Sequence, residues 1–225
     1  METLQKIVSW IPPLLGGARI TILLTITSVS AGIFLSVFLA LGKMSKQVVI
    51  NKFCSAYIFF FRGTPLLMQL YFIYYALPMM SRAFLINTGY AEMDRFIYAF
   101  IAYALNVGAY SAEIVRAAIQ SIDKGQLEAS RALGMSYAQT MRLVIIPQSI
   151  RRLIPPVGNE FILILKDTSL VSMIALIDIT KATRSIEGST RSALVYVPAM
   201  ILYLIITWAF SFVFHKLEKK FSIYE

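Results

Sequence analysis

Five long apolar stretches constrain this chain more than any other feature of its sequence. They run over residues 11–42, 53–80, 96–112, 153–177 and 193–215. Most are close to or longer than the ~20 residues that a helix needs to cross a bilayer core. Hydrophobic residues make up 58% of the chain, above the roughly 45–50% apolar share of soluble domains. Membrane strands would instead alternate over segments of about ten residues. We therefore predict an all-α integral membrane protein, one domain over residues 1–225, with about five transmembrane helices.

Positive charge predicts the orientation of these helices. The segments 43–52, 113–152 and 216–225 together hold 12 Lys and Arg residues, whereas the N-terminus, 81–95 and 178–192 together hold 6. Since Lys and Arg are retained on the cytoplasmic side during insertion, we expect the N-terminus outside and the C-terminus in the cytoplasm. This bias accounts for the net charge of +9, so we expect no nucleic-acid partner. Cys54 is the only cysteine, which leaves no material for a disulfide or a metal site.

The polar segment from about 120 to 147 carries two helix-start signals between the third and fourth apolar stretches. Asp123 is followed three residues later by Gln126, and Ser136 by Gln139. This spacing is typical of a capping box, in which each side chain bonds the backbone N–H of the other residue. We predict two short helices here, on the cytoplasmic side of the membrane.

A glycine and a proline divide this segment. Gly134 suits the end of the first helix because glycine adopts positive φ without steric cost. Pro147 is expected to end the second, since the residue before a proline avoids helical geometry. The pair presents an apolar face made of Leu127, Ala132, Leu133, Tyr137 and Met141. Such a face can bind a groove on a partner protein or lie on lipid headgroups.

The spacing of these residues resembles the EAA loop of ABC-importer permeases, the membrane subunits of ATP-driven uptake systems. The matching positions are Glu128, Ala129, Ser130, Gly134, Val144, Ile146 and Pro147. Ser130 replaces the second alanine of the family pattern, and Val144 and Ile146 replace its Ile and Leu. Segments 62–67, 109–116, 158–161 and 166–170 also resemble permeases for polar amino acids of the histidine, glutamine, arginine and cystine type.

The resemblance implies a permease subunit in the bacterial cytoplasmic membrane that moves a polar amino acid. It implies a second permease copy or a sibling chain, two ATPase subunits that bind Mg-ATP, and an extracytoplasmic solute-binding protein, with membrane lipid around the spans. This chain has no Gly-rich loop ending in Lys-Ser or Lys-Thr, which phosphate cradling requires. We therefore expect no cofactor and no enzymatic activity in the chain itself.

The resemblance also assigns coupling to the ATPases to Glu128, Ala129, Arg131, Gly134 and Pro147. Glu128 can make a charged contact with an ATPase, or it can hold the loop through Arg131, three residues further along the same helix face. Gly134 sets the angle between the two helices.

Ionisable residues inside a span are functional candidates because an unpaired charge in the bilayer is costly. Glu160, Lys166 and Asp167 fall in the fourth apolar stretch. Asp167 before Thr168 resembles a helix cap, which predicts a broken span of the kind that holds substrate in transporters. Alternatively, Lys166 and Asp167 pair with neighbouring helices.

Glu160 either faces the substrate path or pairs with Arg116, Arg151 or Arg152. Glu113 and Arg116, three residues apart, are interpreted first as a structural pair.

Two uncharged amides suit a polar ligand better. Gln69 lies shortly after Thr64-Pro65, and Asn106 lies near the middle of the third stretch. They can bond a substrate without the cost of burying an ion, or they can join helices to one another. Met68 adds an adaptable apolar wall or faces lipid. A rival interpretation is a self-contained channel or proton-coupled carrier that uses Glu160, Lys166 and Asp167.

Overall fold

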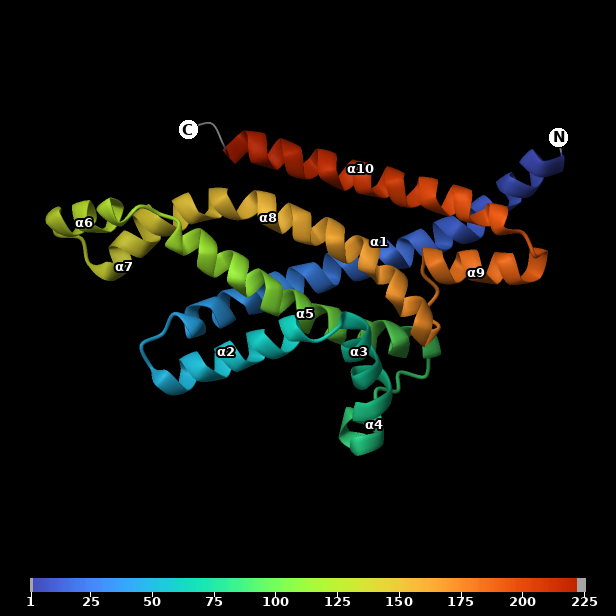
Figure 1. The fold of residues 1–225 in the computed structure, drawn as a ribbon, viewed down its shortest axis with the longest axis horizontal. Helices are drawn as coiled ribbons and strands as arrows, with labels where there is room; N and C mark the ends of the chain where they lie inside the picture. The colour runs from blue at the N-terminus through green and yellow to red at the C-terminus, as the bar shows by residue number, and fades with distance from the viewer. Residues whose placement is uncertain (1, 222–225) are drawn as a thin grey trace.

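A computed structural model describes residues 2–221, and within that range the chain forms helices and no strand. The prediction of an all-α chain is therefore confirmed for these residues. Four long helices follow the long axis of the molecule in Figure 1: α1 (Glu2–Lys43), α5 (Ala91–Gln120), α8 (Ile146–Asp167) and α10 (Tyr196–Phe221). Two short helices, α6 (Lys124–Ala132) and α7 (Tyr137–Thr140), form one end of the molecule, and α9 (Ile179–Thr190) lies towards the other.

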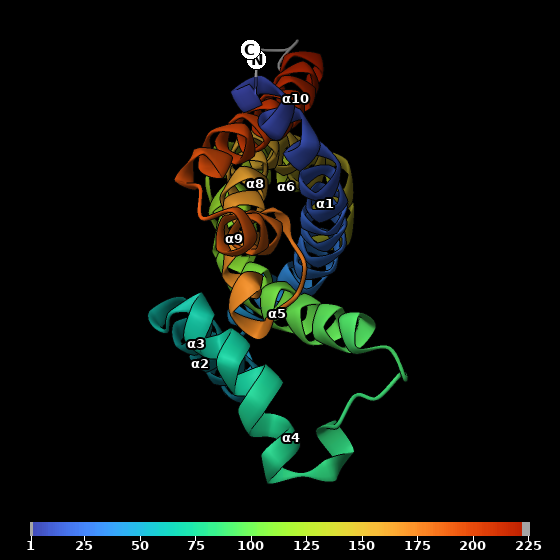
Figure 2. The ribbon, with the colours of Figure 1, turned by 90° about the vertical axis from the view of Figure 1, so that its right-hand side faces the viewer.

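The second apolar stretch is not one straight helix. Helix α2 (Val48–Gly63) ends before Pro65, and the chain bends by 105° into a second run of helix. That run consists of α3 (Leu66–Tyr71), the π-helix η1 (Phe72–Ala76) and α4 (Leu77–Met80). Figure 2 shows it extending sideways from the long helices. Pro65 explains the break, because a proline cannot donate the N–H that an unbroken helix would need.

Short 3₁₀- and π-helical segments connect the remaining elements. They are the 3₁₀-helices η2 (Arg82–Phe84), η4 (Thr168–Ile174) and η5 (Ala193–Val195), and the π-helix η3 (Met141–Ile145) between α7 and α8.

The largest interface joins α1 and α5. Gly32 on α1 allows the close approach, since a Cβ atom there would lie only 2.5 Å from the Cβ of Val107 on α5. Small residues at helix interfaces permit this packing in membrane proteins. The buried centre around it includes Leu24, Tyr103 and Ile164. A second buried cluster, around Trp10 and Leu165, joins α1 and α8 to α9 and α10.

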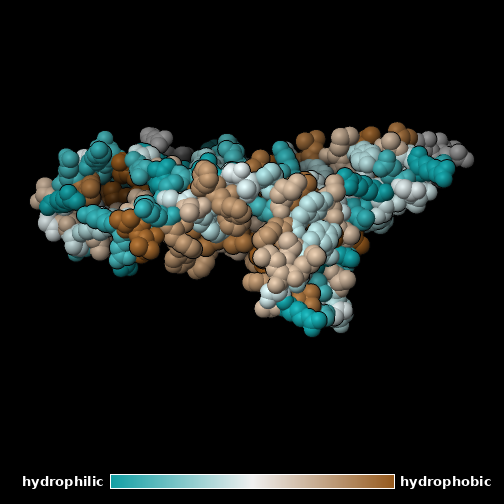
Figure 3. Space-filling model, turned by 60° about the horizontal axis from the view of Figure 1, so that its bottom comes forward, coloured by the Kyte–Doolittle hydropathy of each residue, from teal (hydrophilic) through white to brown (hydrophobic). Residues whose placement is uncertain are grey.

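The surface agrees with a membrane location. Within the described residues, Lys6–Lys43 and Ala193–Phe221 are long and apolar enough to cross a membrane, and the bent pair α2 with α3–α4 counts as a third crossing if taken together. Only 11% of the apolar window in Ala193–Phe221 is buried inside the molecule. In Figure 3, hydrophobic residues dominate the middle of the drawn face and hydrophilic residues its ends. Helices α5 and α8 carry more polar residues, so the number of spans and their orientation remain predictions.

Candidate functional site

The two short helices at the α6–α7 end begin with different caps. Ser136 and Gln139 form the predicted capping box: Gln139 Oε1 accepts from the Ser136 N–H at 2.8 Å, and Ser136 Oγ accepts from the Gln139 N–H at 3.3 Å. The prediction of a second box at Asp123 is wrong. Asp123 Oδ1 accepts from the Gly125 N–H at 2.6 Å, whereas Gln126 Oε1 accepts from Gln148 Nε2 of α8 at 3.4 Å. A tertiary contact thus replaces the local one.

Gly134 ends α6 in the left-handed conformation, with φ +76°. The Gly134 N–H donates to the Arg131 carbonyl at 2.9 Å, and the Met135 N–H donates to the Ser130 carbonyl at 3.0 Å. These two bonds make a Schellman motif, which satisfies carbonyls that a helix end leaves free. The turn between α6 and α7 is therefore fixed by backbone geometry.

The tip of the helix pair is open to contact. Glu128, Ala129 and Arg131 are exposed, and Leu133 is 81% exposed. Of the predicted apolar face, Ala132, Leu133 and Tyr137 are exposed, whereas Leu127 and Met141 are partly buried. Within residues 2–221, no ion pair joins Glu128 to Arg131. The carboxylate of Glu128 thus faces outward, away from the contacts that hold the chain together.

Pro147 does not end a helix, and that prediction is wrong. The chain is helical without interruption from Tyr137 through η3 into α8, and Pro147 lies in the first turn of α8. Because the helix is continuous here, Pro147 leaves one carbonyl of the preceding turn without a backbone donor. Two side chains support nearby carbonyls: Gln148 Nε2 donates to Val144 O at 3.0 Å and Ser149 Oγ to Ile145 O at 2.8 Å. The α6–α7 end is therefore joined directly to α8.

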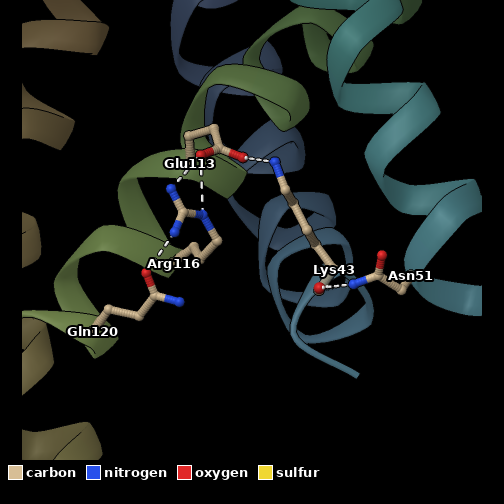
Figure 4. A network of polar contacts seen from close by, with 5 residues as sticks. All are labelled: Lys43, Asn51, Glu113, Arg116 and Gln120. Atoms are coloured by element: carbon tan, nitrogen blue, oxygen red, sulfur yellow. Dashed lines mark hydrogen bonds and ion pairs between the residues drawn. The ribbon is translucent and has the colours of Figure 1, made fainter. Parts of the chain in front are cut away.

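An ion-pair network joins α1 and α5 just before α6 (Figure 4). Lys43 Nζ lies 2.6 Å from Glu113 Oε1, and Arg116 Nη2 lies 2.7 Å from Glu113 Oε2. Asn51 Nδ2 donates to the Lys43 carbonyl, and Arg116 also bonds Gln120. Glu113 lies beyond the predicted span 96–112. Burial alone would raise the pKa of its carboxyl, but hydrogen bonds from Arg116 and Lys43 outweigh burial and lower that pKa.

Gln69 and Asn106 meet at the break before Pro65. In an unbroken helix the Phe61 carbonyl would accept from the N–H of residue 65, which proline lacks. Gln69 Nε2 donates to that carbonyl at 2.9 Å, and Asn106 Nδ2 lies 3.4 Å from it. Gln69 Nε2 also donates to Thr64 O at 3.0 Å and to Thr64 Oγ1 at 2.8 Å. These contacts show the two amides joining helices to one another, the second of the two roles considered for them.

A pocket of about 380 Å³ lies beside the break. Its lining includes Phe61, Thr64, Met68, Gln69 and Leu105. Met68 is 57% exposed, whereas its neighbour Gln69 is buried and bonds Asn106.

The predicted intramembrane charges lie on the same long helix, α8. Glu160 and Asp167 are partly buried and Lys166 is exposed. Within residues 2–221, no ion pair shorter than 4.0 Å includes any of the three. Glu160 instead lies within electrostatic range of two charges, the like charge of Asp167 and the opposite charge of Arg62. The Arg62 guanidinium lies 5.4 Å from the centre of the Tyr110 ring.

Two of the arginines considered as partners of Glu160 bond elsewhere: Arg116 pairs with Glu113, and Arg152 donates to the Ser121 carbonyl. The expected helix cap at Asp167 is wrong. The helix does change at Asp167, where 3₁₀ geometry begins, but the Asp167 side chain makes no capping bond. Its carbonyl instead accepts from Tyr103 Oη at 2.6 Å.

Comparison with known proteins identifies the chain's relatives. The model of a family described as "Binding-protein-dependent transport system inner membrane component" matches residues 32–222. The chain belongs to this family. This inner membrane component is thus a transport subunit in the membrane, and the family predicted from its polar segments is confirmed.

Relatives of this inner membrane component cover nearly its full length. It is 40% identical to the L-cystine transport system permease protein TcyB of Bacillus subtilis over 96% of the chain and 89% of that relative. It is 36% identical to the glutamine transport system permease protein GlnP of Escherichia coli over 95% of the chain and 94% of that relative.

Solved structures agree with the fold. A crystal structure of an amino acid ABC transporter with histidines matches with a TM-score of 0.86 at 39% identity, covering 95% of this chain and 96% of the other. The MetNI methionine ABC transporter in an inward-facing conformation matches with a TM-score of 0.77 at 18% identity, covering 94% and 97%. This second likeness concerns the fold alone.

Proposed function

We propose that this chain is the permease subunit of an ABC importer that moves a polar amino acid across the membrane. The observation that carries the proposal is the exposed α6–α7 pair, in which α7 continues through η3 into α8 without interruption. Relatives over nearly the full length are named as cystine and glutamine permeases, which supports an amino acid as the substrate.

The coupling surface is the tip of the α6–α7 pair. Glu128 and Arg131 offer charged contacts, Ala129 allows close approach, and Leu133 offers apolar area to a groove on an ATPase subunit. Gly134 holds the two helices at a defined angle through its positive φ. Movement of a docked ATPase acts on α7 and passes along the backbone past Pro147 into α8.

The substrate path runs along α8 and the break before Pro65. Glu160, Lys166 and Asp167 supply charge from α8, and Arg62 supplies the opposite charge near Glu160. An amino acid carries both an ammonium and a carboxylate, so groups of both signs can orient it. Met68, Gln69 and Asn106 line or support the neighbouring pocket.

The partners follow from this role. Two ATPase subunits bind Mg-ATP and dock on the cytoplasmic tips, a second permease copy or sibling completes the membrane part, and an extracytoplasmic binding protein delivers the substrate. Lipid covers the exposed apolar residues of α10. The chain itself binds no nucleotide and is not an enzyme.

Reconstitution tests the proposal. The chain is co-expressed with its ATPase and binding protein, placed in proteoliposomes, and assayed for ATP hydrolysis with single amino acids. Stimulation by one polar amino acid, together with its ATP-dependent uptake, is the expected result. Uptake by the chain alone, without ATPase or ATP, would overturn the proposal and favour a self-contained carrier.

A further inference from the structure

The connection between α7 and α8 has an unusual backbone. Met141–Ile145 form a π-helix, in which the Ile146 N–H donates to Met141 O, five residues earlier. Such a turn holds one residue more than an α-helical turn, and single π-turns inside helices are common at functional sites. Pro147 follows directly and cannot donate to the Leu143 carbonyl. The backbone bonds that would hold this segment in one register are therefore fewer than in the helix on either side.

An apolar cavity of about 280 Å³ lies against this segment. Its walls come from α1, α5 and the η3–α8 junction, and include Val37, Ser111, Met141, Ile146 and Ser149. The cavity opens to the surface, since Val37 is 40% and Ile146 44% exposed. The junction thus borders a space into which it can move.

One wall of the cavity also contains an unpaired polar group. Ser111 is only 1% exposed, and its Oγ has no hydrogen-bond partner within residues 2–221. Ser149 Oγ, which also lines the cavity, donates to the Ile145 carbonyl of the π-turn at 2.8 Å. A buried hydroxyl without a partner disfavours the arrangement that leaves it so. The packing seen here is therefore not the only favourable one for this junction.

The helix on the far side of the junction is tied elsewhere. Arg152 Nη1 donates to the Ser121 carbonyl, which holds the start of α8 to the end of α5. Gln148 Nε2 reaches Gln126 Oε1 of α6 at 3.4 Å, a contact that has to break when the tip turns. The π-turn lies between this anchored start and the exposed α7.

We propose that Met141–Pro147 is a joint with two registers. In this structure the joint is π-helical and the cavity is open; in the other register the turn is α-helical and the cavity is closed. A change of one residue in register turns α7 relative to α8 by up to roughly 100° and shifts it by about 1.5 Å. The joint thereby changes the angle at which the docked α6–α7 tip meets the membrane helices. This inference rests on the proposed docking of ATPases at that tip.

Distance measurements between spin labels test the joint. Labels are attached to cysteines at Ala138, which is exposed on α7, and Leu163, which is 52% exposed on α8, in a Cys54→Ser background. Pulsed electron paramagnetic resonance is recorded on the complex with its ATPase subunits, without nucleotide and with ATP trapped. We expect the distance distribution to shift by several ångströms when ATP is trapped.

Cavity filling provides the matched variants. Val37 lines the cavity and is 40% exposed, so Val37→Phe can fill the space from its rim. Val213→Phe makes the same change at a residue of α10 that is 51% exposed and outside the cavity. We expect Val37→Phe to suppress the distance shift and to lower substrate-stimulated ATP hydrolysis at least fivefold, and Val213→Phe to do neither.

A one-residue deletion tests the register directly. Deleting Leu143 removes the extra residue of the π-turn, and we expect the ATP-trapped distance to appear without nucleotide. If this variant fails to insert, the comparison of Val37→Phe with Val213→Phe still decides. An unchanged distance in a complex that hydrolyses ATP with substrate stimulation would overturn the joint while leaving the proposed function intact. Failure to co-purify with any ATPase would instead contradict the proposed function.

Discussion

Asn106 Nδ2 on α5 donates a hydrogen bond of 2.9 Å to Gln69 Oε1 on α3. Gln69 in turn donates to the Phe61 carbonyl, which Pro65 deprives of its helical partner. Two buried amides from different helices thus complete the hydrogen bonding of a broken third. This arrangement lies at the 105° bend between α2 and the helical run that begins with α3.

Replacing Gln69 with leucine removes the donor to the Phe61 and Thr64 carbonyls and leaves Asn106 without its acceptor. An unpaired buried polar group costs about 1–3 kcal/mol, so we expect a lower thermal unfolding temperature for purified Gln69→Leu. Met68→Leu, at the neighbouring exposed position, serves as the control and should unfold like the parent. Equal stability of Gln69→Leu and the parent would contradict a structural role for Gln69.

The two amides should also be coupled. Because they share one hydrogen bond, the destabilisation by Gln69→Leu and Asn106→Leu together should be smaller than the sum of the single effects. A double-mutant cycle on thermal or denaturant unfolding measures the difference. Strictly additive values would show that the contact carries no energy.

Gly134→Val should insert normally but uncouple ATP hydrolysis from transport. A Cβ at Gly134 would meet no atom within 4 Å, so the cost arises from the left-handed backbone, about 1–2 kcal/mol for a residue other than glycine. The turn between α6 and α7 relaxes that strain by changing its angle. Gly188→Val, at a helical glycine that is equally open, controls for bulk. Full transport with full substrate-stimulated hydrolysis in Gly134→Val would refute the coupling role.

Glu128→Gln should weaken ATPase binding without affecting the permease itself. Glu128 is exposed and, within the described residues, makes no ion pair, so the change should alter stability by less than about 0.5 kcal/mol. The yield of ATPase in affinity co-purification is the measurement, and we expect it to fall several-fold. Glu92→Gln, an exposed carboxylate on α5 far from the tip, should retain the parental yield.

The Glu113 network should depend on pH in a definite direction. The folded-state pKa of the Glu113 carboxyl lies below the usual value. The ion pairs therefore stabilise the protein fully above the unfolded-state pKa, and this stabilisation is lost as pH falls through the folded-state pKa. Glu113→Gln should therefore be destabilising at pH 7, with a deficit that shrinks at pH 4 and below. Unfolding of both proteins across that range measures it, and a constant deficit would contradict the ion pairs as its cause.

Local signals predicted the α6–α7 pair well. Position 134 needs a residue that tolerates positive φ, and Ser136 and Gln139 bond each other within one turn. The turn and the capping box therefore both depend on residues close in sequence. Pro147 misled the prediction. The residue before a proline disfavours helix, but here the π-turn Met141–Ile145 keeps the chain helical up to Pro147, and Gln148 and Ser149 donate to its carbonyls.

Contacts between distant segments could not be predicted in the same way. Lys43 pairs with Glu113 across 70 residues of sequence, and nothing in either local pattern selects the other. Pro65 is a local signal for the break. The bonds from Asn106 that stabilise the break depend on the packing of α5 against α2 and α3, which no local pattern predicts. The charges of α8 were located correctly on one helix, whereas their partners depended on which side chains the neighbouring helices presented.

Helix α8, on the membrane side of the proposed joint, has the proportions of a lever. Its 22 residues span roughly 33 Å, so a tilt of about 10° about one end displaces the other end by about 6 Å. A small movement at the joint would thus become a larger one at the far end of α8, and its direction would depend on where along α8 the fulcrum lies.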